Sequence, residues 1–199
     1  MGGTRCAGRL ICLVPETSTH RVMPTLTLER INAMPPQAFL AALGGVFEHS
    51  PWIAEQAFSA RPFASVAALH EAMVNAVKRA PHERQLALLN AHPELAGKEA
   101  QAGALTSSST AEQASAGLSV LNREQMRTLA RWNREYRDKF GFPFIIAVRR
   151  HTQASIFSEF QRRLANHAET ELDACLEQVF LITRLRLDDL VAAQTGSAT

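Results

Sequence analysis

The chain has 199 residues, of which 46% are hydrophobic and 20% charged, and its formal net charge is +2. This length fits one domain with a sizeable hydrophobic core. The small net charge, without a block of like charges, argues against a nucleic-acid-binding surface, and no apolar run approaches the roughly 20 residues of a membrane-spanning helix. The three cysteines form no CxxC pair, which argues against a disulfide framework and a cysteine-ligated zinc site. We therefore expect an intracellular globular protein that binds neither nucleic acid nor a membrane.

The two ends of the chain differ in composition from the part between them. Residues 1–23 combine Arg5 and Arg9 with an apolar run that is too short for a secretory signal. We expect a loosely ordered tail here. The simplest explanation is that translation is assigned to an upstream start codon and that Met23 is the natural first residue. The alternative is an organelle-targeting segment. The polar residues 194–199 form a second tail, so the folded domain is expected at 24–193.

Proline, serine and glycine signals divide the domain into helices. Pro35 and Pro36 open the first helix and Gly44–Gly45 closes it, because proline is favoured at helix starts and glycine at helix ends. Three further helices are expected before residue 93: one capped by Ser50 that runs to Phe58, one capped by Ser65 that runs through Val77, and one opened by Pro81 that ends at His92. A short helix capped by Ser109 is expected at 110–118, and a long helix should begin at the capping box of Asn122 with Gln125 and end at Gly141. The last two helices are expected at 153–166 and 168–193.

Two segments do not fit the helical pattern. Residues 99–109 are rich in alanine, glycine and serine, and we expect a loop there. Residues 142–148 (FPFIIAV) are apolar and β-branched like a strand, but no second strand is available to pair with them. We therefore expect a buried extended segment, and the predicted fold class is all-α, a single-domain compact helical bundle.

The stretch 88–98 (LLNAHPELAGK) joins an apolar helix to a histidine, a proline and a glycine. Pro93 disfavours helical geometry at His92, so the helix should stop there and leave the imidazole free to face a pocket. A histidine titrates near neutral pH, which suits proton transfer. A packing or capping role for His92 explains the same position, and the local sequence leaves both interpretations open.

Arg186 interrupts the apolar face of the last predicted helix. Steps of three and four residues place it between Val179 and Ile182 on the helical wheel. A buried unpaired charge is costly, so the guanidinium must be paired or must face a cavity. Anion or substrate binding is one interpretation, and a side chain that reaches solvent or pairs with Asp189 is the other.

Glu112 lies within the first turn after the predicted cap Ser109. A carboxylate there stabilises the positive end of the helix dipole. Alternatively, the backbone N–H groups of this helix start bind an anion or a polar ring, with the amide of Gln113 beside them.

Motifs of metal, nucleotide and serine-nucleophile chemistry are absent from the sequence. His70-Glu71 and His82-Glu83 begin like a zincin motif, but neither is followed by a histidine at the fourth position. No GxGxxG, GxSxG or Walker pattern occurs either. We therefore expect no metal ligands.

Five separated stretches resemble one protein family. They are FLAALGGVFEHSPWIAEQA, LLNAHPELAGK, SSTAEQASAGL, YRDKFGFPFIIAVR and LITRLRLDDLV, and they span about residue 25 to 192 in the order and spacing of the family. The chain is thereby similar to the 2-oxo-4-hydroxy-4-carboxy-5-ureidoimidazoline (OHCU) decarboxylases of urate breakdown. This resemblance implies an all-α fold, a homodimer, no cofactor, and formation of (S)-allantoin from a small ureide with release of carbon dioxide.

The resemblance also implies roles for individual residues. His92 corresponds to the proposed proton donor of the family, Glu112 is a second catalytic candidate, and Arg186 is the arginine of the LRL stretch. The substrate-binding residues implied are Pro93 beside the histidine, Ser109, Thr110, Ala111 and Gln113 in the SxxEQ stretch, and Phe144, Ile145, Ile146, Ala147 and Val148 in the extended segment.

The expected chemistry needs no cofactor, because the substrate carboxylate sits on a carbon beside a C=N bond that can absorb the negative charge left by carbon dioxide. Arg186 and backbone N–H groups near 145–148 and 109–113 would hold the polar ring. His92 would protonate one face of the carbanion-like carbon, and Glu112 would orient the substrate or take its hydroxyl proton. Two alternatives stay open: a helical protein-interaction module in which His92 and Arg186 only pack, and a cofactor-free hydrolase or isomerase acting on another ureide.

Two departures from the family pattern concern the ends of the chain. The tail before Met23 has no counterpart in the family, and the chain ends in GSAT rather than in the SKL-like peroxisomal signal of animal members. We therefore expect a cytoplasmic location.

Overall fold

Helices make up almost all of the regular structure in the computed structural model, which describes residues 26–191. The tails expected at 1–23 and 194–199 lie outside these residues. Within residues 26–191 the single β-type contact is an isolated bridge between Leu26 and Val191, so the predicted all-α class is confirmed. The α-helices are α1 (Leu28–Ala33), α2 (Pro36–Leu43), α3 (Trp52–Ala57), α4 (Val66–Lys78), α5 (His82–Asn90), α6 (Lys98–Gln101), α7 (Ser107–Ser115), α8 (Arg123–Phe140), α9 (Gln153–Leu164) and α10 (Ala168–Leu190), with 3-10 turns η1 (Phe58–Ala60), η2 (Leu118–Val120) and η3 (Val148–Arg150).

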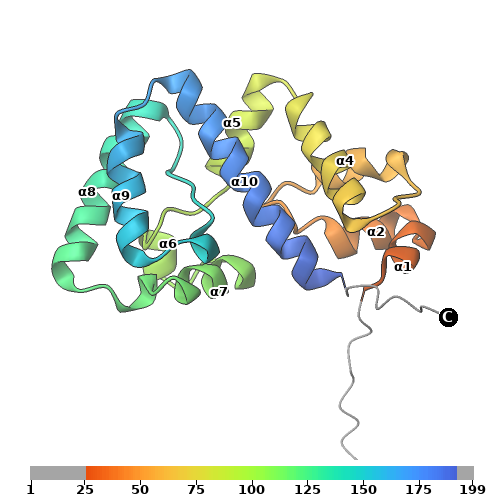
Figure 1. The fold of residues 1–199 in the computed structure, drawn as a ribbon, viewed down its shortest axis with the longest axis horizontal. Coiled ribbons are helices and arrows are strands. Elements are labelled where there is room, and N and C mark those ends of the chain that lie inside the picture. Colours follow the sequence, from red (N-terminus) through yellow and green to blue (C-terminus); the bar gives the residue numbers. More distant parts are fainter. Residues whose placement is uncertain (1–25, 192–199) are drawn as a thin grey trace, which may run out of the picture.

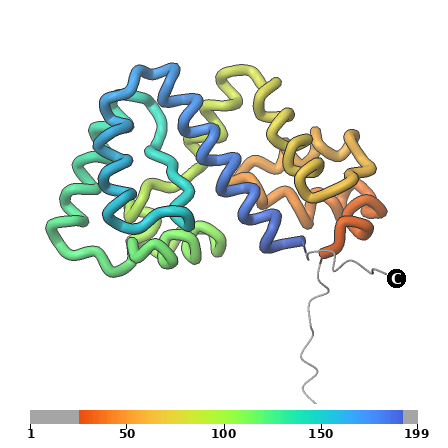
Figure 2. Tube along the Cα trace, in the orientation of Figure 1, coloured from red at the N-terminus to blue at the C-terminus, as the bar shows by residue number. Residues whose placement is uncertain are grey.

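Helix α10 is the element around which the others are arranged. It runs diagonally across the molecule, with α1, α2 and α4 on one side and α6 to α9 on the other (Figure 1), and the Cα trace in Figure 2 follows the same path. It packs against α4, α5 and α8, and the Leu26–Val191 bridge brings its end beside the start of α1. Because α10 has neighbours on both sides, it carries residues such as Arg186 into the interior. Although α10 is long, neither it nor any other helix within residues 26–191 has the continuous apolar length needed to cross a membrane.

Several helix ends lie where the local sequence predicts them. Ser65 Oγ accepts a hydrogen bond from the N–H of Ala68 at 3.0 Å and caps α4. Asn122 and Gln125 form the predicted capping box of α8. Gly141 ends α8 in the left-handed region at φ +80°, which favours glycine.

Three local expectations are wrong. Residues 99–109 are not one loop, because they contain most of α6 and the first residues of α7. Helix α7 begins at Ser107, and its cap is Thr106, whose Oγ1 accepts a hydrogen bond from the N–H of Ser109 at 3.3 Å. The predicted cap Ser50 makes no capping hydrogen bond to α3 and is buried instead. A run of serines and threonines offers several possible caps, so local propensity could not select Thr106.

The segment 142–148 is buried and extended as expected, except that Val148 already belongs to η3. Side chains rather than a neighbouring strand bind its backbone. Arg163 Nη1 donates to the carbonyl of Ile145 at 2.7 Å, and the N–H of Ala147 donates to Oε1 of Gln178 at 2.9 Å.

Candidate active site

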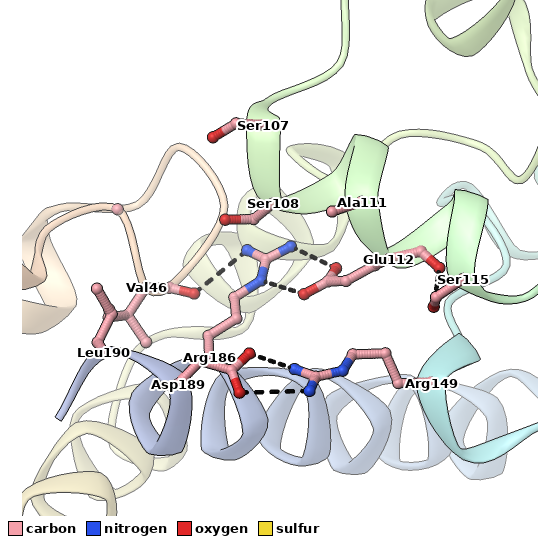
Figure 3. Close-up of a pocket in the computed structure, with 11 residues that line it drawn as sticks. Val46, Ser107, Ser108, Ala111, Glu112, Ser115, Arg149, Arg186, Asp189 and Leu190 are labelled. Carbon is pink, nitrogen blue, oxygen red and sulfur yellow. Dashed lines mark hydrogen bonds and ion pairs between the residues drawn. The ribbon is translucent and has the colours of Figure 1, made fainter. Parts of the chain in front are cut away.

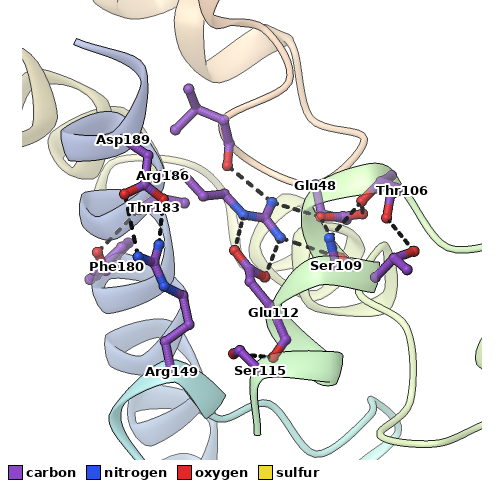
Figure 4. A network of polar contacts seen from close by, with 12 residues as sticks. Glu48, Thr106, Ser109, Glu112, Ser115, Arg149, Phe180, Thr183, Arg186 and Asp189 are labelled. Atoms are coloured by element: carbon purple, nitrogen blue, oxygen red, sulfur yellow. Dashed lines mark hydrogen bonds and ion pairs between the residues drawn. The ribbon is translucent and has the colours of Figure 1, made fainter. Parts of the chain in front are cut away.

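Arg186 lies between two carboxylates from distant parts of the chain (Figure 4). Its Nη1 donates to Oε2 of Glu48 at 2.7 Å, while its Nε and Nη2 donate to the two carboxylate oxygens of Glu112, each at 2.8 Å. The arginine flagged on the helical wheel is therefore buried and paired. Its partner is not Asp189, which pairs with Arg149 instead.

Glu48 has more hydrogen-bond donors around it than Glu112. Thr106 Oγ1 donates to its Oε1 at 2.7 Å, and Ser109 Oγ donates to its Oε2 at 3.2 Å. Burial alone would raise the pKa of Glu48, but the Thr106 hydrogen bond and the Arg186 charge outweigh it and hold the pKa below its ordinary value. The Arg186 pKa is raised, because the two carboxylates outweigh the effect of burial. Arg186 and Glu48 are therefore both charged at neutral pH.

No pattern in the sequence singles out Glu48. It follows two buried apolar residues, Val46 and Phe47, in the turn region after α2. An acidic residue directly after two core residues is a weak signal, and no helical periodicity in this turn could strengthen it.

His92 follows the end of α5 and folds back onto it. Its Nδ1 lies 2.9 Å from the carbonyl oxygen of Leu88. A carbonyl oxygen can only accept, so Nδ1 carries the hydrogen and Nε2 of the neutral ring is an acceptor. Nε2 is buried and has no hydrogen-bond partner among the described residues, which is uncommon for a polar atom. Burial lowers the pKa of His92 to about 4, against the opposing effects of the Leu88 hydrogen bond and the Glu48 charge, so the ring is neutral at pH 7.

Most of the expected site residues meet around a small inner cavity of about 40 Å³. Helix α7, the turn after α5, the extended segment and α10 surround it. Its lining residues are His92, Pro93, Leu95, Ser109, Glu112, Gln113, Phe144, Ile145, Ile146, Val148, Ile182 and Arg186.

Figure 3 shows a larger outer cleft, of about 550 Å³, which shares lining residues with the inner cavity. Glu112 and Arg186 line both spaces and so form the boundary between them. The other residues of the outer cleft are Gly45, Val46, Ser107, Ser108, Ala111, Ser115, Arg149, Asp189 and Leu190.

Comparison with known proteins identifies the family to which this arrangement belongs. Residues 32–188 match the family model described as OHCU decarboxylase. The chain belongs to the OHCU decarboxylase family. The predicted resemblance is thereby confirmed, and the protein is an enzyme, a carboxy-lyase, rather than an interaction module.

Individual relatives of this decarboxylase agree with the family match. The 2-oxo-4-hydroxy-4-carboxy-5-ureidoimidazoline decarboxylase of Haloferax volcanii is 42% identical over 172 residues, which cover 86% of this chain and 100% of the relative. The enzyme of the same name from Halalkalicoccus jeotgali is 39% identical over 175 residues, covering 88% of this chain and 97% of the relative. A crystal structure of (S)-allantoin synthase superimposes with a TM-score of 0.67 and 26% identity, covering 84% of this chain and 54% of that chain.

Three residues expected in the decarboxylase site lie away from the inner cavity. Ala111 lines the outer cleft, and Thr110 lines a separate pocket beside α7. Ala147 is buried, and its N–H is occupied by Gln178. Conversely, Leu95 and Ile182 line the inner cavity, but as apolar residues they look like ordinary core in the sequence.

The start of α7 differs from the predicted one. Because α7 begins at Ser107, Glu112 lies in its second turn and not its first, and the N–H of Ser109 is bound by Thr106. The segment therefore presents side chains to the decarboxylase site. One of these, Gln113, also fastens the turn after α5: its Oε1 accepts from the N–H of Ala96 at 3.0 Å.

Metal ligands are not grouped in the part of the decarboxylase that the structure describes. Within residues 26–191, no cluster of three or more histidine, cysteine, aspartate or glutamate side chains could hold a metal ion.

Proposed function

We propose that this decarboxylase converts 2-oxo-4-hydroxy-4-carboxy-5-ureidoimidazoline to (S)-allantoin and carbon dioxide in urate degradation. Family membership supports the reaction class. The observation that carries the proposal for this chain is the buried, paired Arg186, which borders the same cavity as the unpartnered Nε2 of His92. An arginine suits the carboxylate that the substrate loses, and a free imidazole nitrogen suits the proton that the product gains.

The bond changes of this reaction need no added electron sink. Ring carbon 4 of the substrate carries the hydroxyl and carboxyl groups, and carbon 5, which carries the ureido group, forms a double bond to a ring nitrogen. When the bond from carbon 4 to the carboxylate breaks, its electron pair forms a double bond between carbons 4 and 5, and the ring nitrogen takes up a proton. The resulting enol becomes allantoin when the hydroxyl oxygen loses its proton and carbon 5 gains one.

His92 is the proposed proton carrier for the last step. Its Nδ1–H is committed to Leu88, so Nε2 is the atom that can take up and release a proton. A neutral imidazole must accept a proton before it can donate one, so we assign His92 the role of a shuttle that takes the hydroxyl proton and delivers it to one face of carbon 5. Delivery to a single face accounts for a single enantiomer.

The other site residues hold the substrate in this proposal. Arg186 binds the carboxylate, and Glu112 orients the hydroxyl group. Their position at the boundary of the inner cavity supports these roles. The contacts proposed for the rest of the substrate come from Pro93, Ser109, Gln113, Phe144, Ile145, Ile146 and Val148, which line the same cavity.

We also propose that the enzyme is a cytoplasmic homodimer with its folded domain at 24–193. The resemblance to the family supports the dimer. Size-exclusion chromatography with light scattering tests the dimer, and a monomer mass would contradict it.

The test of the reaction is stereochemical. The unstable substrate is generated from urate in situ, the protein is added, and the circular dichroism of the allantoin formed is followed together with the release of carbon dioxide. We expect rapid build-up of the (S) enantiomer. Slow racemic product that the protein does not change would contradict the proposal, and turnover without added carbon dioxide release would favour a hydrolase or isomerase.

The role of His92 is tested in the same assay with His92→Asn. A well-placed acid–base group contributes roughly two to four powers of ten in rate, so turnover should fall by about that factor. His70→Asn is the matched control, because His70 contacts Thr183 away from both cavities, and its turnover should stay near that of the wild type. Near-wild-type turnover in His92→Asn would remove the shuttle from the mechanism.

A further inference from the structure

The two carboxylates bound to Arg186 differ in how firmly they are held. Glu48 is 2% exposed and accepts hydrogen bonds from Thr106 and Ser109 as well as from Arg186. Glu112 is 13% exposed, and Arg186 is the one donor to its carboxylate among the described residues. Moving the Glu112 side chain therefore breaks its pairing with one residue. Moving the Glu48 side chain breaks its pairings with three residues and leaves the buried charge of Glu48 itself without partners.

The two carboxylates also bind different edges of the guanidinium. Glu48 and the carbonyl of Val46 hold Nη1, at 2.7 and 3.3 Å. Glu112 holds Nε and Nη2 in a bidentate pair, and Ser109 Oγ accepts a longer hydrogen bond from Nη2 at 3.3 Å. This is the geometry in which an arginine binds any carboxylate, so a substrate carboxylate can take the place of Glu112 without leaving Arg186 uncompensated.

The inner cavity by itself is too small for the substrate. The inner cavity of about 40 Å³ has room for about one water molecule, which is much less than the ureidoimidazoline needs. Because Glu112 and Arg186 line both the inner cavity and the outer cleft of about 550 Å³, a rotation of the Glu112 side chain away from Arg186 joins the two spaces.

We propose that Glu48 is a positioning residue that holds Arg186 in place, and that Glu112 is the carboxylate that gives way to the carboxylate of the substrate. This inference rests on the proposed function. Glu48 keeps the Nε and Nη2 edge of Arg186 turned toward the cavities during the exchange. Glu112, once released, is free to reach the hydroxyl group of the bound substrate.

The test compares Glu48→Gln and Glu112→Gln, two identical changes at the same arginine. The probes are hydantoin-5-acetate, a stable five-membered ring with a carboxylate, and hydantoin, which lacks the carboxylate. We expect Glu48→Gln to weaken the binding of hydantoin-5-acetate by roughly tenfold or more relative to hydantoin, because a charge-assisted bond that orients Arg186 is lost. We expect Glu112→Gln to strengthen it, because a neutral amide is easier to displace from Arg186 than a carboxylate.

Changes of opposite sign in the affinity of the two variants for hydantoin-5-acetate would show that Glu48 positions Arg186 and does not act through its charge alone. If Glu48 acted only as a nearby negative charge, its removal would strengthen the binding of an anion, as in Glu112→Gln. Equal or tighter binding of hydantoin-5-acetate to Glu48→Gln would therefore overturn the inference. In the reaction assay, the same variant should raise KM by a larger factor than it lowers kcat, and the reverse pattern would also contradict a role through Arg186.

A second pair of variants keeps the test independent of whether Glu48→Gln folds. Thr106→Val removes a donor to Glu48 but keeps all the charges, so it should weaken hydantoin-5-acetate binding in the same direction and by less. Thr106→Ser keeps the hydroxyl group and should restore binding, whereas equal binding by all three proteins would count against the inference. If the wild-type protein produced no single enantiomer of allantoin from urate, the proposed function would be refuted. This outcome differs from those that refute only the inference about Glu48 and Glu112.

Discussion

Two arginines are buried with carboxylates in this decarboxylase, but in different surroundings. Arg163 pairs with Glu171, and their side chains are 3% and 0% exposed. Glu171 also accepts hydrogen bonds from the hydroxyl of Tyr136 and the amide of Asn166, and Arg163 donates to the carbonyl of Ile145. Neither Arg163 nor Glu171 lines the inner cavity or the outer cleft.

The network of Arg186 differs by bordering open space on one side. Its partner Glu112 lines both cavities and has no other donor within residues 26–191, so it can be exchanged for a ligand. Glu171 has several fixed partners and nothing to exchange with. Burial of a charge therefore does not by itself mark a functional site; a buried charge with a replaceable partner beside a cavity does.

The largest expected effect is on stability, at the network that we interpret as structural. Arg163→Met leaves Glu171 buried without its counter-charge, which should lower the free energy of unfolding by about 3–5 kcal/mol. Urea denaturation measures this. The double variant Arg163→Met with Glu171→Leu should recover much of the lost stability. A loss below about 1 kcal/mol in the single variant would mean that Glu171 is no more firmly held than Glu112, which would contradict the difference between the two networks.

The next effect is the pH dependence of the protein's stability, which we expect to come from His92 in the same site as Arg186. The pKa of His92 is about 4 in the folded protein and near its ordinary value of 6.5 in the unfolded chain. Between these values the unfolded chain binds a proton that the folded protein does not, so stability is full above about pH 6.5 and falls as the pH drops, by roughly 3 kcal/mol at pH 4. Urea denaturation of the wild type and His92→Asn between pH 7 and 5 should show a shallower pH slope in the variant. Because the lowered pKa of His70 acts in the same direction, only the difference between the two proteins is informative, and equal slopes would contradict burial of a neutral His92.

The smallest expected effect separates charge from geometry at the site. Arg186→Lys keeps a positive charge but loses the bidentate pairing, so kcat/KM should fall by roughly 10- to 100-fold. Arg184→Lys is the matched control on the same helix, because Arg184 makes an exposed pair with Asp188, and it should change kcat/KM little. Equal kinetics in the two variants would mean that Arg186 acts through charge alone.

The sequence by itself determined those features that depend on neighbours along the chain. Capping at Ser65 and Asn122 and the stop at Gly141 follow from hydrogen bonds and backbone preferences within a few residues, so they could be predicted. The position of Arg186 on an apolar helix face follows from helical periodicity in the same way, and the buried extended segment follows from its composition.

The tertiary structure alone decided which groups meet. Glu48 and Arg186 are 138 residues apart in the chain, so no local pattern could pair them. Glu48 also contacts the unexpected start of α7, because the hydroxyl of Thr106 caps the helix and donates to Glu48. A buried charge takes its partner from whichever segment packing brings to it, and that choice depends on the whole core rather than on the residues beside it.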